Sequence, residues 1–155
     1  MADVPGLVLT GLNAVKAGLE ADIPELYAIL FPGDAEPETI APRDKWPRPD
    51  KWLAILAADA GQEQGIRALG NFEREQRVEG VLRLWVYESA LADLAETLET
   101  GRRRALNSIE ATGKANNFDK ASWTVDWTGW RTLTGRTGKP PYVGVAIGLA
   151  FRIFE

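Results

Sequence analysis

A chain of 155 residues fits a single domain that buries a sizeable core. It contains no cysteine, which excludes a disulfide framework and a thiolate metal site, and no histidine, which removes the commonest general base. A net charge of −4 argues against general binding to duplex nucleic acid. We therefore expect no enzyme, and function has to be inferred from architecture and surfaces.

Charge is distributed unevenly along the chain. Residues 1–60 hold 10 acidic and 5 basic side chains, whereas residues 101–155 hold 4 acidic and 9 basic ones. Such a chain has either scattered solvated charges or acidic and basic surfaces that meet on neighbouring copies. No apolar run approaches the roughly 20 residues of a membrane helix, and the start of the chain lacks the basic stretch of a secretory signal. We expect neither membrane insertion nor export.

The amino-terminal third predicts two helices and a long arm. Apolar spacing indicates a helix from Pro5 to about Leu19, and Asp22 with Pro24 is typical of the start of a second short helix that runs to Leu30. Five prolines within residues 32–50 exclude a central strand and a continuous helix there, so this segment is expected to be an exposed arm. Trp46 near its end anchors the arm either to the body of the same chain or to a partner.

The middle of the chain predicts two strands and a long helix. Trp52–Ala58 is the first strand, Ala60–Arg77 is expected to be a polar excursion, and Arg77–Glu88 is a strand with apolar residues on both faces. The helix is expected to begin after a cap at Ser89 and to run from Leu91 to about Thr112, where Gly113 stops it. Its arginine triplet, at positions 102–104, forms either a solvated face that complements the helix dipole or a contact with phosphate or an acidic neighbour.

The end of the chain predicts a hairpin of two strands. Ser122–Leu133 alternates, with Gly129 marking a bulge. Thr134–Pro141 is the connection, with a basic tip at Arg136 and Lys139. In Tyr142–Phe154 large apolar residues at the odd positions alternate with small ones at the even positions, so one face needs a helix over it and the other permits close approach.

Three segments resemble chemical motifs but do not match the residue patterns that those motifs require. The run from Gly135 to Lys139 lacks the first glycine, the terminal hydroxyl residue and the following helix of a phosphate loop. The acids Asp34, Glu36 and Glu38 lack the spacing of a calcium loop. Aromatic residues on the strand that begins at Ser122 more often fill a core than stack on a ligand. We predict no catalytic residue, no cofactor and no metal site.

These elements predict an α+β domain over residues 1–155. Its four-stranded, mainly antiparallel sheet carries two main helices, in the order α-β-β-α-β-β. The pattern resembles the tail terminator, or tail completion, proteins of long-tailed bacteriophages and related gene-transfer particles. The resemblance covers most of the chain. It is carried by the pattern of residues 80–106 (GVLRLWVYESALADLAETLETGRRRAL), residues 121–133 (ASWTVDWTGWRTL) and residues 142–155 (YVGVAIGLAFRIFE). The arm at 32–50 departs from it.

The resemblance implies a structural virion protein. Such proteins form a ring, usually of six copies, that caps the tail tube, ends its polymerisation and offers a docking surface to the head. The implied partners are further copies, the tail tube protein and head–tail connector proteins. DNA passes through the ring without sequence-specific recognition, and the implied location is the virion tail, with the host cytoplasm during assembly. The alternatives are another connector or neck protein, and a small enzyme or ligand-binding module that uses the aromatic strand face.

For a ring, the expected functional residues lie at subunit or partner interfaces. Basic residues near the last hairpin and on the long helix are candidates for contact with acidic neighbours, and a tryptophan is a candidate tether of the arm to an adjacent subunit. These residues are Trp46, Arg102, Arg103, Arg104, Arg131, Arg136 and Lys139.

The hairpin tip gives a first test. Replacing Arg136→Glu together with Lys139→Glu reverses the charge of the tip, so assembly should be impaired while the monomer stays folded. Light scattering measures the assembly and circular dichroism the fold. Normal rings from the double variant would remove the hairpin from the mechanism.

Overall fold

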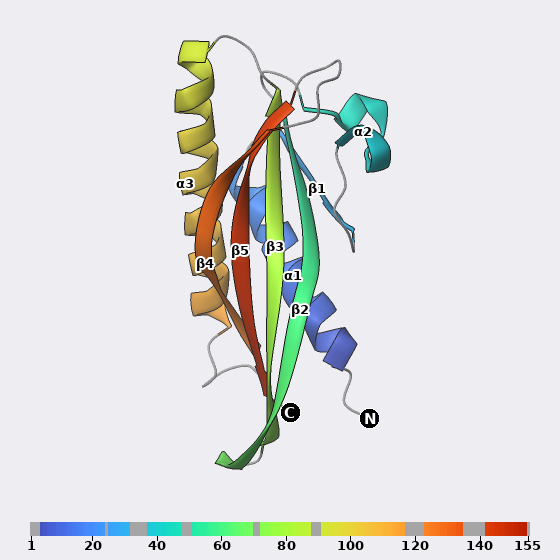
Figure 1. Cartoon of the computed structure of the whole chain (residues 1–155), viewed down its shortest axis with the longest axis vertical. Helices are drawn as coiled ribbons and strands as arrows, with labels where there is room; N and C mark the ends of the chain where they lie inside the picture. Colours follow the sequence, from blue (N-terminus) through green and yellow to red (C-terminus); the bar gives the residue numbers. More distant parts are fainter. Residues whose placement is uncertain are drawn as a thin grey trace.

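The computed structural model describes residues 4–23, 25–31, 37–47, 51–69, 72–87, 91–116, 123–134 and 142–154 (Figure 1). The described chain is an α+β fold, with a five-stranded sheet in the order β1-β2-β3-β5-β4. Its strands are β1 (Leu26–Leu30), β2 (Trp52–Leu69), β3 (Phe72–Tyr87), β4 (Trp123–Thr134) and β5 (Tyr142–Phe154). β1 pairs in parallel with β2, and the other neighbours are antiparallel.

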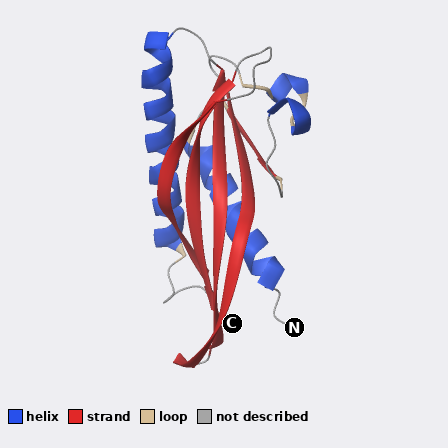
Figure 2. Ribbon diagram, in the orientation of Figure 1, coloured by secondary structure: helices blue, strands red, loops and turns tan. Residues whose placement is uncertain are grey.

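Two long helices cover one face of this sheet. α1 (Val4–Asp22) lies behind the sheet in Figure 1, and α3 (Leu91–Ala115) lies beside β4. The short helix α2 (Pro37–Ile40) and the 3-10 turn η1 (Arg43–Lys45) lie apart from them near one end of the sheet, as the colouring of Figure 2 makes plain.

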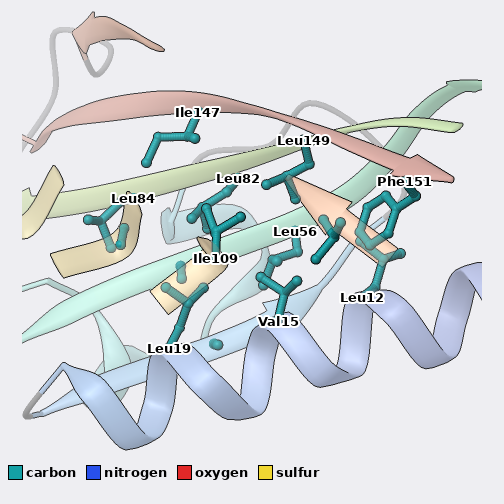
Figure 3. Close-up of a cluster of buried hydrophobic side chains, with 14 of the residues drawn as sticks. Leu12, Val15, Leu19, Leu56, Leu82, Leu84, Ile109, Ile147, Leu149 and Phe151 are labelled. Atoms are coloured by element: carbon teal, nitrogen blue, oxygen red, sulfur yellow. The ribbon is translucent and has the colours of Figure 1, made fainter. Parts of the chain in front are cut away.

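The alternation in β5 determines which face the helices cover. Ile147, Leu149 and Phe151 are at most 1% exposed and point toward the helices (Figure 3). They meet Leu12, Val15 and Leu19 of α1, whose spacing of three and four residues puts them on one side of the helix. Burying each such side chain contributes about 1.5–3 kcal/mol, which more than offsets the weak helix propensity of a segment that contains glycines.

Two glycines mark where the helices approach their neighbours most closely. A Cβ at Gly11 of α1 would lie 2.8 Å from Cε1 of Phe151, so the absent side chain lets the helix settle onto β5. Gly113 of α3 lies against β4, and a Cβ there would overlap the carbonyl oxygen of Val125. The prediction that Gly113 stops the helix is therefore wrong: α3 continues to Ala115, and the glycine serves packing.

The predicted second short helix is also wrong. Residues 26–30 form β1, whose backbone pairs with residues 52–56 of β2 from Leu26↔Trp52 to Leu30↔Leu56. α1 itself runs on to Asp22, and Glu25 then adopts a φ of 59°, which redirects the chain into the strand. A long-range pairing has overridden a local helix signal, and the sheet accordingly has five strands in place of four.

The predicted polar excursion between the first two strands is a third error. β2 and β3 form a long antiparallel pair from Leu53↔Trp85 to Leu69↔Phe72, with register shifts between Ala58 and Ala60 and between Gly65 and Leu69. Backbone hydrogen bonds sustain this ladder where the sequence shows no apolar alternation. The strand predicted from residue 77 thus begins at Phe72, and it lies between β2 and β5. This central position is one of the two arrangements that apolar residues on both faces indicate, the other being an outer face covered by another chain.

The carboxy-terminal predictions are confirmed within the described residues. β4 and β5 pair antiparallel, and the bulge predicted at Gly129 lies between Trp127 and Gly129. The cap expected at Ser89 and the connection at 134–141 fall outside the described residues, except for Thr134 at the end of β4.

The contact of α3 with β4 gives a stability test. Gly113→Ala should lower the free energy of unfolding by about 1–2 kcal/mol, because the overlap with a backbone oxygen outweighs the gain in helix propensity. Gly129→Ala is the matched control, since a Cβ there meets nothing within 4 Å, and its effect should stay within about 0.5 kcal/mol. Urea denaturation followed by circular dichroism measures both, and equal stability of the two variants would contradict the packing role of Gly113.

Candidate subunit-interface site

The sheet face opposite the helices has two parts. At one end lies an apolar group, the outer cluster, in which Leu53, Ile55, Trp85 and Tyr142 are at most 4% exposed. Partly buried residues of β1 and of the arm pack on it, among them Tyr27, Ile29, Ile40, Ala41 and Trp46. The described part of the arm, residues 37–47, therefore folds back onto the body and is not wholly exposed as predicted.

Trp46 is the anchor of this cover. Its Nε1 donates a hydrogen bond to the Ala41 carbonyl oxygen at 2.9 Å. Its ring meets that of Tyr142 edge to face, with centroids 6.5 Å apart and planes at 81°. The structure thus supplies the intramolecular contact that was one of the two alternatives for this residue. A contact with an adjacent subunit remains a prediction.

Below the outer cluster, the outward residues of β3, β5 and β4 form cross-strand rows. The register places Arg83, Ala146 and Arg131 in the first row, and Val81, Gly148 and Gly129 in the second. The third row holds Glu79, Ala150 and Asp126, and the fourth holds Arg77, Arg152 and Thr124. We call the first three rows the banded face, because two arginines, an uncharged row and two acids follow one another along the strands.

The banded face is open and shallow at its centre. A groove of about 470 Å³ runs over it, with Ala146, Gly148 and Ala150 of β5 in its floor. Thr128, the extra residue of the β4 bulge, lies over Gly148 in the place of a side chain. Glu79, Asp126 and Arg131 are exposed, and Arg83 is half-buried.

The arginine triplet lies on the helix side of β4. The Arg102 guanidinium stacks 3.9 Å from the centroid of the Trp130 ring and lies 4.0 Å from Glu99, while Arg103 and Arg104 are exposed on α3. Arg131 is the next residue after Trp130 and points to the opposite face. The structure thus separates the triplet from Arg131, and Arg136 and Lys139 lie outside the described residues.

The two edges of the sheet differ in how much of each is covered by a neighbouring element. α3 lies along the β4 edge, where Thr124 Oγ1 donates to the Gly113 carbonyl oxygen at 3.0 Å and Trp127 Nε1 donates to Glu110 Oε1 at 3.3 Å. On the other side β1 covers only residues 52–56 of β2, with Phe31 N–H donating to the Leu56 oxygen at 3.0 Å. From Ala57 onward, no strand within the described ranges pairs with that edge of β2.

Beyond the last pair of β5, only two strands remain. Glu75 is the last β3 residue paired with β5, whereas β2 and β3 pair further at Gly65↔Arg74 and, after a register shift, at Leu69↔Phe72. This two-stranded extension is the ribbon; its described residues are 65–69 and 72–74, and Figure 1 shows it extending past the other strands. A ribbon of two strands is marginally stable alone.

Sequence reasoning found Arg131 but not Glu79, Arg83 and Asp126, which share the banded face with it. The signal was present in the alternation of both strands. The register between β3, β5 and β4, which sets these charges in rows, could not be predicted from the sequence.

No protein-family model matches the chain, and no curated protein matches it. Among the described residues, no helix is long and apolar enough to cross a membrane, and no three acidic side chains lie close enough to hold a metal ion.

Substitution of Trp46 distinguishes its two possible roles, an anchor of the arm within the chain or a contact with an adjacent subunit. If it anchors the arm within the chain, Trp46→Ala should lower the free energy of unfolding of the monomer by about 2–3 kcal/mol. Trp46→Phe keeps an aromatic ring but loses the hydrogen bond and part of the ring contact, so it should cost less, about 1–2 kcal/mol. Chemical denaturation at low concentration measures both; unchanged monomer stability with impaired assembly would assign Trp46 to a neighbouring subunit.

Proposed function

We propose that this protein is a structural component of a phage-type particle that assembles into a closed ring, caps the tail tube and ends its growth. The proposed ring has six copies, docks the head through one face, lets DNA pass, and performs no chemical turnover. The observation that carries the proposal is the ribbon together with the edge of β2 beyond Leu56, with which no strand in the described part of the chain pairs.

The ribbon suits a ring because its contact is directional. When the ribbon of one copy lies on a different surface of the next, the contact is heterologous, and such contacts close into rings when the rotation per subunit allows it. The β4 edge differs, because α3 lies beside it and accepts side-chain hydrogen bonds from Thr124 and Trp127. The chain is therefore asymmetric in the way that head-to-tail assembly requires.

A shortened ribbon tests this role. Gln64 and Glu75 are paired directly, so residues 65–74 can be replaced by Asn-Gly, which closes a tight hairpin. The shortened chain should keep the thermal midpoint of the wild type within a few degrees but fail to form rings, as judged by light scattering and negative-stain microscopy. Ala21→Ser, at an exposed position of α1, is the control and should form rings normally. Rings of normal size from the shortened chain would remove the ribbon from the assembly contact.

The tail length of particles that lack the protein distinguishes a tail terminator from another connector protein. Loss of a terminator should give tails of uncontrolled length, because nothing stops tube growth, whereas loss of a neck protein should leave tails of normal length without heads. Electron microscopy distinguishes the two, and normal-length tails would overturn the terminator role while leaving a structural role intact.

A further inference from the structure

We propose that, in the ring, an acidic segment of one copy docks on a basic surface beside the β4 edge of the next copy. The acidic segment is residues 32–38, which contain Asp34, Glu36 and Glu38. This contact rests on the proposed ring and deepens it, because it names a surface of one copy and the segment of its neighbour that meet there.

The receiving surface lies where α3 meets the β4 edge, and we call its residues Arg103, Trp130 and Arg131 the arginine seam. Trp130 is 47% exposed, and the Arg102 guanidinium stacks on its ring, which holds the indole in place. Arg103 and Arg131 are exposed, and neither has a hydrogen bond or ion pair within the described part of the chain. An exposed indole that is already held, between two free guanidiniums, has the composition of an interface anchor.

The bulge in β4 brings the indole and Arg131 to this edge together. Thr128 is the extra residue, between Trp127 and Gly129. Beyond it, Trp130 returns to the helix side of the sheet and Arg131 points to the opposite side. A regular strand would exchange these two directions and place Arg131 under α3. Bulges at sheet edges are a recurrent means of re-aiming a side chain.

The acidic segment begins at the opposite edge of the sheet. β1 is the edge strand on that side, and Phe31 N–H donates to the Leu56 oxygen of β2 directly before the segment. Residues 26–42 contain three acids and no base. Residues 32–36 lie outside the described chain, which continues at α2, where Pro37 is buried. Figure 1 shows α2 and α3 beyond opposite sides of the sheet, so one copy presents the acids and the seam to two different neighbours.

The register places the start of the acidic segment and the seam at the same height along the strands. Leu30, the last residue of β1, pairs with Leu56, which pairs with Leu82 of β3. Leu82 pairs with Ile147 of β5, and Ile147 pairs with Trp130. Copies in a cyclic ring are related by rotation about one axis, which keeps heights along that axis unchanged. With the strands along the axis, the segment that follows Leu30 faces Trp130 of the next copy.

The charges disfavour other ways of placing two copies side by side. A twofold contact between two β1 edges sets acids on acids, and one between two β4 edges sets arginines on arginines. The carboxylates that α3 turns toward β4, those of Glu99 and Glu110, already have partners in Arg102 and Trp127. Only the head-to-tail arrangement joins opposite charges. Because exposed ion pairs add little affinity, they determine the choice of neighbour and the salt dependence of the ring.

Charge exchange on the full-length chain tests the contact. One variant carries Asp34→Lys and Glu36→Lys, and the other carries Arg103→Glu and Arg131→Glu. Each alone places like charges across the contact, so the concentration needed for rings at low salt should rise about tenfold, as measured by light scattering. An equimolar mixture should restore rings, because the two variants alternate around the proposed six-copy ring and every contact joins opposite charges. A chain with all four changes should form rings by itself for the same reason.

Arg104→Glu is the matched control. It makes the same change of charge, but it lies about 200° around α3 from Arg102 and therefore on the side turned away from β4. It should form rings as the wild type does. Circular dichroism shows whether each variant is folded. Where a double change disturbs folding, Asp34→Lys in one chain and Arg131→Glu in the other give the same mixing test.

The outcomes separate this contact from the proposed function. The contact is overturned if the wild type stays monomeric, if either double variant forms rings as readily as the wild type, or if mixing does not restore rings. Rings from both double variants would leave the ring standing on another contact. The tail length of particles that lack the protein judges the terminator role independently of all these variants.

Discussion

The structure depends on the two-residue alternation of side-chain size along β5. Its large side chains need an apolar cover, and α1 supplies this through Leu12, Val15 and Leu19. Its small side chains leave the opposite face low and open, flanked by the charges of β3 and β4. One strand thus fixes the position of the helices, the location of the core and the side of the molecule that is left for contact.

The two sheet faces consequently have different roles. The helix face is closed by hydrophobic burial within the chain. The outer face is closed at one end by the arm, through Trp46 and the outer cluster, and stays polar over the banded face. The described part of the arm thus covers the apolar part of this face, which is the part most prone to aggregate, and leaves the charged residues Glu79, Asp126 and Arg131 exposed.

The strands and helices with strong periodicity could be predicted from the sequence, and those set by distant partners could not. β5, β4 and α3 follow from alternation and from helical spacing. β1 was predicted as a helix because residues 22–30 carry helix-start residues, and only its pairing with β2 makes it a strand. The ribbon was not predicted because its sequence shows no apolar alternation, and only the backbone pairing identifies it as strand. The charged rows needed the register between strands, which no local pattern contains.

The inequality of the two sheet edges has a consequence for how the protein behaves when concentrated. A sheet with two open margins can add copies indefinitely and grow into a filament. Here α3 lies along the β4 margin and accepts hydrogen bonds from the side chains of Thr124 and Trp127, so a strand added there would have to compete with the helix. The helix thereby disfavours fibril growth through that margin.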